Sequence, residues 1–198
     1  MAGTHENLEH AEQAQHASHS GNKKIALLIS ILALLLAFSE TLGKSAQTEA
    51  LTTNIKASDT WGFFQAKTIR QTALRVAAEG LGAQASGIAD PAAKAEIAKQ
   101  IEAWKGTVAR YESDPKGQDG REELRVRAEH YEHERDTAMA RYHHYEIASA
   151  TLQIGIVLAS AAIITGTTIL IWLAGGLGAV GVFFIAVGLW APHAFHLM

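Results

Sequence analysis

Apolar segments near both ends of the chain flank a charged segment with helical patterning. Residues 25–42, 154–173 and 177–191 are predominantly apolar, and residues 154–173 carry no charged side chain. A helix needs about 20 apolar residues to cross the hydrocarbon core of a bilayer. We therefore predict transmembrane helices over residues 23–44, 147–173 and 177–192, with a turn between the last two at Gly175 and Gly176.

The first apolar run could instead be a secretory signal peptide, since Lys23 and Lys24 precede it. In a signal peptide, however, the basic residues come near the start and small residues follow the apolar run. Here residues 1–22 form a polar tail before the run, and Phe38-Ser39-Glu40 follows as a poor cleavage context. We therefore predict a membrane span with a lysine near each interface.

The tail of residues 1–22 contains four histidines that invite comparison with a metal site, namely His5, His10, His16 and His19. Their spacing is irregular and no pair of carboxylates fixes a coordination geometry, as a structural metal site would require. We interpret this segment as a solvated tail.

The charged segment, residues 45–146, is predicted to form a soluble helical domain. Residues 46–81 are rich in helix-forming polar residues and end at Gly80-Leu81-Gly82. Asp90 followed by Pro91 is typical of a helix start, because aspartate caps the first turn and proline suits the first helical position. An apolar stripe spaced by three and four residues then marks a second helix, at Ile97, Ile101, Trp104, Val108 and Tyr111.

A third soluble helix is predicted after Asp119, which with Glu122 forms a plausible capping pair. One of its faces alternates spacings of four and three residues through Leu124, Ala128, Tyr131, Arg135, Ala138, Tyr142, Tyr145, Ser149 and Leu152. We call this face the seam. Such a period is typical of coiled coils and calls for a partner helix, which could belong to this chain or to a second copy.

The number of helical passes poses a topological problem, because three antiparallel soluble helices would end at the wrong end of the domain. Either the first soluble helix breaks near residues 58–62, or the link over residues 81–90 runs back along the domain. We predict the first solution, with a bend near Asp59.

Charge and composition narrow the possible partners. The formal net charge is −3, and acids and bases are nearly balanced within the charged segment. A nucleic-acid binder would show a one-signed basic face, so we expect no nucleic-acid partner. The chain contains no cysteine, which excludes disulfides and thiolate metal sites.

Two motifs resemble a known family. Residues 55–70, with Lys56-Ala57-Ser58-Asp59, Trp61 and Gln65-Ala66-Lys67, are similar to the signature of the bacterial membrane-protein family called domain of unknown function 4337. Arg141-Tyr142-His143-His144, followed by residues 150–156, resembles the start of that family's second span. The resemblance implies one span, a helical domain and two further spans, but no activity, substrate or catalytic residue. Basic residues often found between that family's last two spans are absent from residues 173–177.

Histidines and carboxylates near the end of the charged segment are the strongest metal candidates. His130, His133 and Glu134 lie close to Glu129 and Glu132 on one helical stretch. They match no zinc-protease or di-iron pattern and lie off the seam. We interpret them as a solvent-exposed charged surface.

Ionisable residues also lie near the predicted membrane interfaces. His143, His144 and Glu146 stand between or beside tyrosines, which is typical of an interface. Glu40 lies one turn inside the first span, where a charge is costly unless it is paired. Lys44 follows four residues later, so we predict an interfacial Glu40–Lys44 pair.

The remaining candidates have structural interpretations. Aromatic residues in the charged segment are predicted to fill its core, with Trp104 buried, rather than to line a ligand pocket; they are Trp61, Phe63, Phe64, Trp104 and Tyr111. Gly178, Gly181 and Gly188 permit close helix packing in lipid.

Together these patterns predict an all-α protein with three transmembrane helices and a partly coiled-coil-like soluble domain between the first and second spans. We assign no catalytic, cofactor-binding or metal site, and we expect no enzyme. We predict a homo-oligomeric membrane assembly element whose copies associate through the seam and the glycine-rich spans. The alternative is a small transport or channel-associated protein that uses Glu40. Lys23 and Lys24 favour a cytoplasmic tail, which places the soluble domain in the periplasm of a cell with an inner membrane; Arg135 and Arg141 argue for the opposite orientation.

Overall fold

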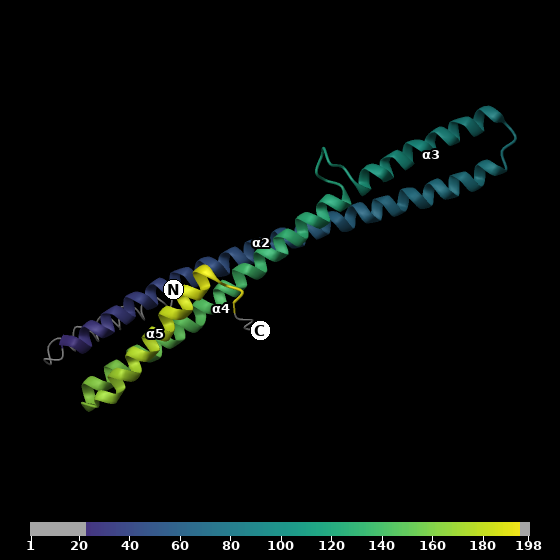
Figure 1. Ribbon diagram of the computed structural model, residues 1–198. Coiled ribbons are helices and arrows are strands. Elements are labelled where there is room, and N and C mark those ends of the chain that lie inside the picture. The colour runs from purple at the N-terminus through teal and green to yellow at the C-terminus, as the bar shows by residue number, and fades with distance from the viewer. Residues whose placement is uncertain (1–22, 195–198) are drawn as a thin grey trace. The chain divides into compact units, whose positions relative to one another are not determined.

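The computed structural model describes residues 23–194, which are almost entirely helical (Figure 1). The helices are α2 (Lys23–Ser86), α3 (Pro91–Glu112), α4 (Arg121–Thr165) and α5 (Thr168–Trp190). The described residues contain no strand. α2, α4 and α5 each contain a stretch long and apolar enough to cross a membrane. The prediction of an all-α fold with three such helices is confirmed.

The chain divides into two compact units, and α2 and α4 each contribute to both. One unit, here called the apolar unit, combines the described parts of residues 1–51 and 135–198; the other, here called the polar unit, is residues 52–134. Each unit has its own packing.

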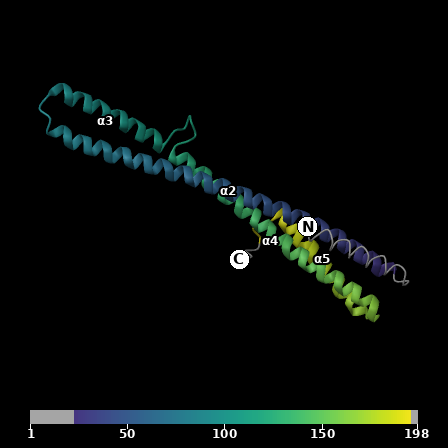
Figure 2. The same cartoon turned by 180° about the vertical axis from the view of Figure 1, so that it is seen from behind.

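The apolar unit packs three helices around one core. Its buried residues come from α2, α4 and α5: Ile29, Leu32, Leu36, Ala148, Leu152, Ile156, Ala159, Ala174 and Ile185. Figures 1 and 2 both show α5 alongside the last part of α4. Gly155 lets the backbones of α4 and α5 approach closely, since a Cβ there would lie 3.3 Å from the Ala174 carbonyl oxygen and 3.4 Å from a Leu32 methyl.

The turn between α4 and α5 lies at Gly166 and Thr167, so its predicted position at Gly175 and Gly176 is wrong. Gly166 adopts a φ of +69°, and its amide donates to the Ala162 carbonyl oxygen at 2.9 Å. This left-handed conformation suits glycine and ends α4. The two predicted turn glycines lie inside α5 instead. Thr165, Thr167 and Thr168 flank Gly166 and mark this position in the sequence, whereas a glycine pair alone does not distinguish a turn from a helix interior.

The seam of α4 finds a partner within the chain. In the apolar unit Ala138, Tyr145 and Leu152 are buried, and the Ser39 hydroxyl of α2 donates to the Tyr145 carbonyl oxygen at 3.0 Å. In the polar unit Leu124 and Ala128 are buried as well. α2 of the same chain therefore contacts this face, which is one of the two partners that the sequence leaves open.

The polar unit pairs α2 with two successive antiparallel partners. The Gln71 side chain bonds to Val108 and Glu112 of α3, while Thr68 and Trp61 bond to Arg121 and Glu132 of α4. Lower residue numbers on α2 thus meet higher numbers on its partners. α3 and the start of α4 both run opposite to α2, in series, and Figures 1 and 2 show α3 beside the second half of α2.

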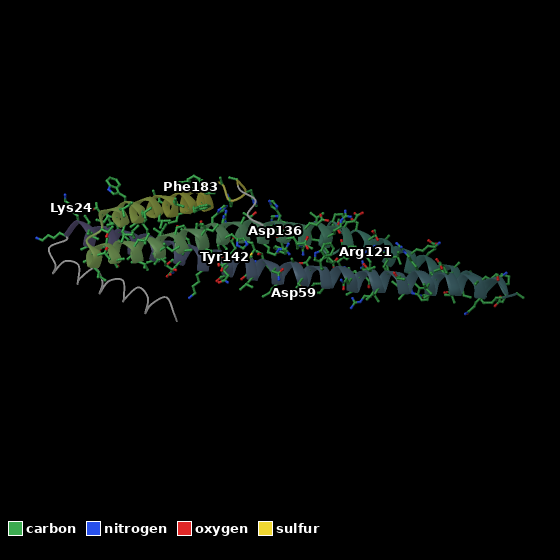
Figure 3. The ribbon with its side chains drawn as sticks, turned by 90° about the horizontal axis from the view of Figure 1, so that it is seen from below. Lys24, Asp59, Arg121, Asp136, Tyr142 and Phe183 are labelled. Atoms are coloured by element: carbon green, nitrogen blue, oxygen red, sulfur yellow. The ribbon has the colours of Figure 1, made fainter. Side chains whose placement is uncertain are left out.

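This arrangement solves the topological problem without a bend, and the predicted break near Asp59 is wrong. α2 continues through residues 58–62 and past Gly80-Leu81-Gly82 to Ser86, and its ribbon passes Asp59 without interruption (Figure 3). Thr53, Ala57 and Thr60 are buried, so packing holds this stretch helical. Within the polar unit α2 runs in one direction, and α3 and the start of α4 both run in the opposite direction. The chain therefore leaves this unit at the end where α2 entered it.

The predicted start of α3 is confirmed, whereas that of α4 needs correction. Asp90 Oδ1 accepts a hydrogen bond from the Ala92 amide at 3.0 Å, with Pro91 as the first helical residue. At α4 the carboxylate that caps the preceding loop belongs to Glu123, which accepts from the Ser113 hydroxyl and the Asp114 amide. The Asp119–Glu122 capping pair does not form, because Asp119 turns to Lys67 at 2.7 Å.

Candidate functional site

A polar cleft between α2 and α4 in the apolar unit is the strongest candidate site. Its volume is about 440 Å³. It is lined by Ser39, Glu40, Gly43, Lys44, Gln47, Tyr142, Tyr145, Glu146, Ser149, Ala150 and Gln153. Both walls therefore combine ionisable side chains with hydroxyls and amides, in a unit whose core is otherwise apolar.

The sequence places this cleft at the ends of two apolar segments. On α2 the apolar run stops at Leu42, and on α4 the polar residues up to Gln153 precede the apolar stretch. Gly43 brings the helices together, since a Cβ there would lie 3.5 Å from the Tyr145 Cβ. The Ser39–Tyr145 hydrogen bond fixes the helices on the apolar side of the cleft.

Glu40 lies on the cleft wall without a charged partner. Its side chain is half-buried, and no ion pair within 4 Å joins it to Lys44 or to another residue in the described part of the chain. The predicted Glu40–Lys44 pair is therefore wrong. Both side chains line the same cleft, so the Glu40 carboxylate and the Lys44 ammonium can each bind a charged group of a ligand.

The two adjacent histidines of α4 have different environments. His143 Nδ1 lies 3.8 Å from Glu146 Oε2 at the surface. His144 is buried, stacks on Phe184 of α5, and its Nε2 lies 3.0 Å from the Pro192 carbonyl oxygen. His144 therefore packs α4 against α5 and the residues that follow it, while its place at a membrane interface stays a prediction.

A second polar cluster joins the three helical segments of the polar unit. The Arg121 guanidinium donates to Thr68 Oγ1 at 2.9 Å, to Gln71 Oε1 at 2.8 Å and to Glu112 Oε2 at 2.7 Å. It also lies over the Phe64 ring, 4.9 Å from its centroid. Figure 3 labels Arg121. This cluster determines how α3 and α4 meet α2.

Carboxylates around this cluster are held in their charged form. The hydrogen bond from Gln71 and the nearby Arg121 lower the pKa of Glu112. The Lys67 ammonium lowers the pKa of Asp119, and the Ser113 hydroxyl lowers that of Glu123. These contacts join α2 to α3, α2 to the loop before α4, and that loop to α4, so they hold the segments of the polar unit together.

The other histidine and carboxylate candidates do not converge on a metal site. His130 Nε2 lies 3.3 Å from Glu134 Oε1, with both side chains exposed, while Glu132 accepts from the Trp61 indole. Among residues 23–194 no group of three or more potential ligands could hold a metal ion. The four histidines of the tail lie outside the described residues.

The predicted aromatic core of the polar unit is only partly formed. Trp61 packs edge-on against Phe64, with ring centroids 5.4 Å apart. Phe63 is 66% exposed. Trp104 is half-buried, and α3 has no buried residue, so the prediction of a buried Trp104 is wrong. A helix packed on one side by a single partner cannot enclose so large a side chain.

Sequence reasoning missed the residues that connect elements, above all Gln71 and Ser39. Gln71 is buried to 2% exposure and stands seven residues from Phe64 and Ala78 on the packed face of α2. That spacing was visible in the sequence, but a glutamine among polar neighbours gave no reason to place it inside. Ser39 likewise resembles an ordinary interfacial serine.

The sequence comparison identifies the family. The model of the family described as "Domain of unknown function (DUF4337)" matches residues 21–191. This range covers all the described helices. The chain belongs to this family. No curated protein and no solved structure gives a significant match. The DUF4337 description assigns no ligand, activity or residue role, so the function must be argued from the geometry of the chain.

Proposed function

We propose that this DUF4337 protein is a non-enzymatic membrane assembly element whose copies associate through an exposed face of α2. This outer face consists of Ile55, Gly62, Ala66, Ile69, Ala73, Val76 and Gly80, all exposed. Ile55, Ile69 and Val76 are 61%, 69% and 62% exposed. These exposed apolar residues on one helix face of the polar unit are the observation that carries the proposal.

The outer face has the spacing of a helix–helix contact. Ile55, Gly62, Ile69 and Val76 follow one another at intervals of seven residues. Each is followed four residues later by a second position of the same face, at Asp59, Ala66, Ala73 and Gly80. Single exposed apolar residues are ordinary on a protein surface, but a seven-residue repeat on one face is typical of a coiled-coil seam. A Cβ at Gly62 or Gly80 would meet nothing within 4 Å, so the face is open to a partner backbone.

The opposite face of the same helix is already occupied. Ala57, Phe64, Gln71 and Ala78 repeat at seven residues and are buried or half-buried. They face the elements that Gln71 and Arg121 hold together. α2 therefore has two seven-residue repeats in the polar unit, and among residues 23–194 only one of them is covered by other helices.

A second copy of this chain fits the outer face in a parallel arrangement. α2 is one continuous helix that includes a candidate span, so copies inserted alike in one bilayer point α2 the same way. In a parallel pair the flanking residues meet as Ser58–Phe63, Gln65–Arg70 and Thr72–Ala77, none of which joins like charges, and Asp59 at the start of the face is the one charge that meets its counterpart. An antiparallel pair centred near Ile69 would bring Arg70 towards its own counterpart, so the shared insertion of α2 is the argument that favours the parallel pair.

This proposal moves self-association to a surface that the sequence analysis did not select. The seam contacts α2 of its own chain, and Gly155, Gly178 and Gly181 receive side chains or backbone from within the same apolar unit. On the outer face of α2, by contrast, a Cβ at Gly62 or Gly80 would meet nothing within 4 Å.

Particle mass tests the proposal directly. The full chain is reconstituted in lipid nanodiscs at micromolar concentration, and its mass is compared with that of the Ile69→Glu/Val76→Glu variant. We expect a dimer or higher assembly for the natural chain and at least a tenfold weaker association for the variant, a change of about 1.4 kcal/mol.

Val126→Glu supplies the matched control, because Val126 is 61% exposed on α4 of the same unit. This variant should associate like the natural chain. A strictly monomeric natural chain, or equal weakening by Val126→Glu, would contradict the proposal.

Transport is the second candidate, and the unpaired Glu40 in its cleft is the observation that favours it. A conducting path would need further polar groups along the spans. The hydroxyls of Ser30 and Ser160 bond instead to their own helix backbone, at Ala26 and Ile156, and that of Ser39 bonds to the Tyr145 backbone. Ion flux in reconstituted vesicles separates the two functions, because an assembly element conducts nothing.

A further inference from the structure

The cleft between α2 and α4 has the chemistry of a receptor for a small zwitterion. Glu40 and Glu146 supply carboxylates, and Lys44 supplies an ammonium group. Gln47 and Gln153 add amides that can donate or accept hydrogen bonds. Its charged groups are therefore of both signs, and neither Glu40 nor Lys44 has an ion-pair partner among the described residues.

The position of the cleft along its helices points to the source of that zwitterion. The cleft begins where the apolar run of α2 ends and finishes where the apolar stretch of α4 begins. In a bilayer this boundary coincides with the headgroup layer. Tyr142 on the cleft wall, labelled in Figure 3, is a residue type enriched at that depth.

An apolar wall continues from the cleft in the direction of the membrane. Ile154 and Val157 lie one helical turn beyond Ala150 and Gln153 of the cleft, on the same side of α4. They are 53% and 61% exposed. A molecule with its polar end in the cleft would therefore find apolar side chains for its acyl chains.

We propose that this cleft binds the headgroup of a phospholipid with a primary amine, with the ammonium between Glu40 and Glu146 and the phosphate at Lys44. The ammonium has three N–H donors, which two carboxylates can accept, and the phosphate pairs with the lysine. A quaternary ammonium has no N–H to donate, and an anionic lipid without an amine leaves Glu40 unpaired. The cleft therefore selects phosphatidylethanolamine over phosphatidylcholine and phosphatidylglycerol.

Native mass spectrometry of the full chain in detergent tests this assignment. The protein is titrated separately with phosphatidylethanolamine, phosphatidylcholine and phosphatidylglycerol of identical acyl chains. We expect preferential retention of phosphatidylethanolamine, and Glu40→Gln should weaken its binding about tenfold, the change that loss of about 1.4 kcal/mol produces. Glu146→Gln should also weaken binding. Because Glu146 is exposed, this variant tests the cleft even if Glu40→Gln fails to fold.

Glu49→Gln is the matched control, since it removes the same charge from α2 outside the cleft and should bind phosphatidylethanolamine like the natural chain. Equal retention of the three lipids, or equal weakening by Glu49→Gln, would overturn the proposal. Glycerophosphoethanolamine, which has the same headgroup without acyl chains, should compete poorly. If it displaces the lipid at equal concentration, the cleft serves a soluble phosphorylated amine and the lipid assignment fails.

Discussion

Gly188 of α5 lies directly against the ring of Tyr145 of α4, so close that a Cβ at Gly188 would lie 2.6 Å from Tyr145 Cε1. The Tyr145 side chain is buried, and its backbone carbonyl accepts from Ser39 of α2. One glycine thus permits a contact that links all three apolar helices.

This contact predicts that Gly188→Ala destabilises the apolar unit, because the added methyl must displace a rigid aromatic ring. Overpacking of this kind typically costs about 1–3 kcal/mol. Gly175→Ala on the same helix is the control, since a Cβ there meets nothing within 4 Å. Thermal unfolding in detergent, followed by circular dichroism, should show a lower Tm for Gly188→Ala only. Equal Tm values would show that α5 packs differently.

Arg121 is expected to be the most sensitive charged residue of the polar unit. Arg121→Ala removes its hydrogen bonds to Gln71 and Glu112 and should lower the free energy of unfolding by about 2 kcal/mol, as for hydrogen bonds to charged groups. The control is Arg125→Ala, whose residue contacts Glu129 at 3.9 Å with both side chains exposed. That change should stay within about 0.5 kcal/mol. Denaturant titration measures both, and similar losses would remove the special role of Arg121.

Acid is expected to weaken the polar unit through Glu112. Its pKa in the folded chain is lowered below the usual 4.5 by Gln71 and Arg121, so the folded state favours the carboxylate. The resulting stability is present above about pH 4.5 and is lost as the pH falls through the lower folded-state pKa. Glu112→Gln should therefore melt below the natural chain at neutral pH, with the difference shrinking in acid. A difference independent of pH would contradict this assignment.

Membrane orientation is predicted from Lys23 and Lys24, which place the tail in the cytoplasm and the polar unit in the periplasm. The chain lacks cysteine, so single cysteines can report the topology. In intact cells with a permeable outer membrane, an inner-membrane-impermeant thiol reagent should label Lys116→Cys, in the loop before α4, but not Thr165→Cys, at the α4–α5 turn. The reverse pattern would show that Arg135 and Arg141 determine the orientation.

How far the sequence predicted the fold depended on whether a feature was encoded locally. Asp90 and Pro91 placed the start of α3 correctly, because capping involves neighbouring residues. The α4–α5 turn was misplaced, because its signal is the backbone conformation of Gly166, and the Gly175-Gly176 pair is a competing turn signal in the sequence. The continuity of α2 at Asp59 depends on partners more than 60 residues away in sequence, such as the bond between Trp61 and Glu132.

The candidate site shows the same limit. The sequence identifies Glu40 because a charged side chain inside a membrane span is energetically costly. It wrongly predicts Lys44, the nearest opposite charge in sequence, as the partner of Glu40. Gln153 and Glu146 join it only because α2 and α4 are antiparallel neighbours. A single sequence provides the polar residues of such a cleft but not their convergence.

Self-association through the outer face of α2 is tested most directly by disulfide cross-linking of a single cysteine in native membranes. In a parallel pair equivalent positions of the two outer faces lie opposite each other, so Ile69→Cys should form a covalent dimer under mild oxidation. Ala98→Cys, on an exposed position of α3, should remain monomeric. Efficient dimerisation of Ile69→Cys alone is the predicted result, whereas no cross-link at Ile69, or equal cross-linking at both positions, would contradict the proposed assembly.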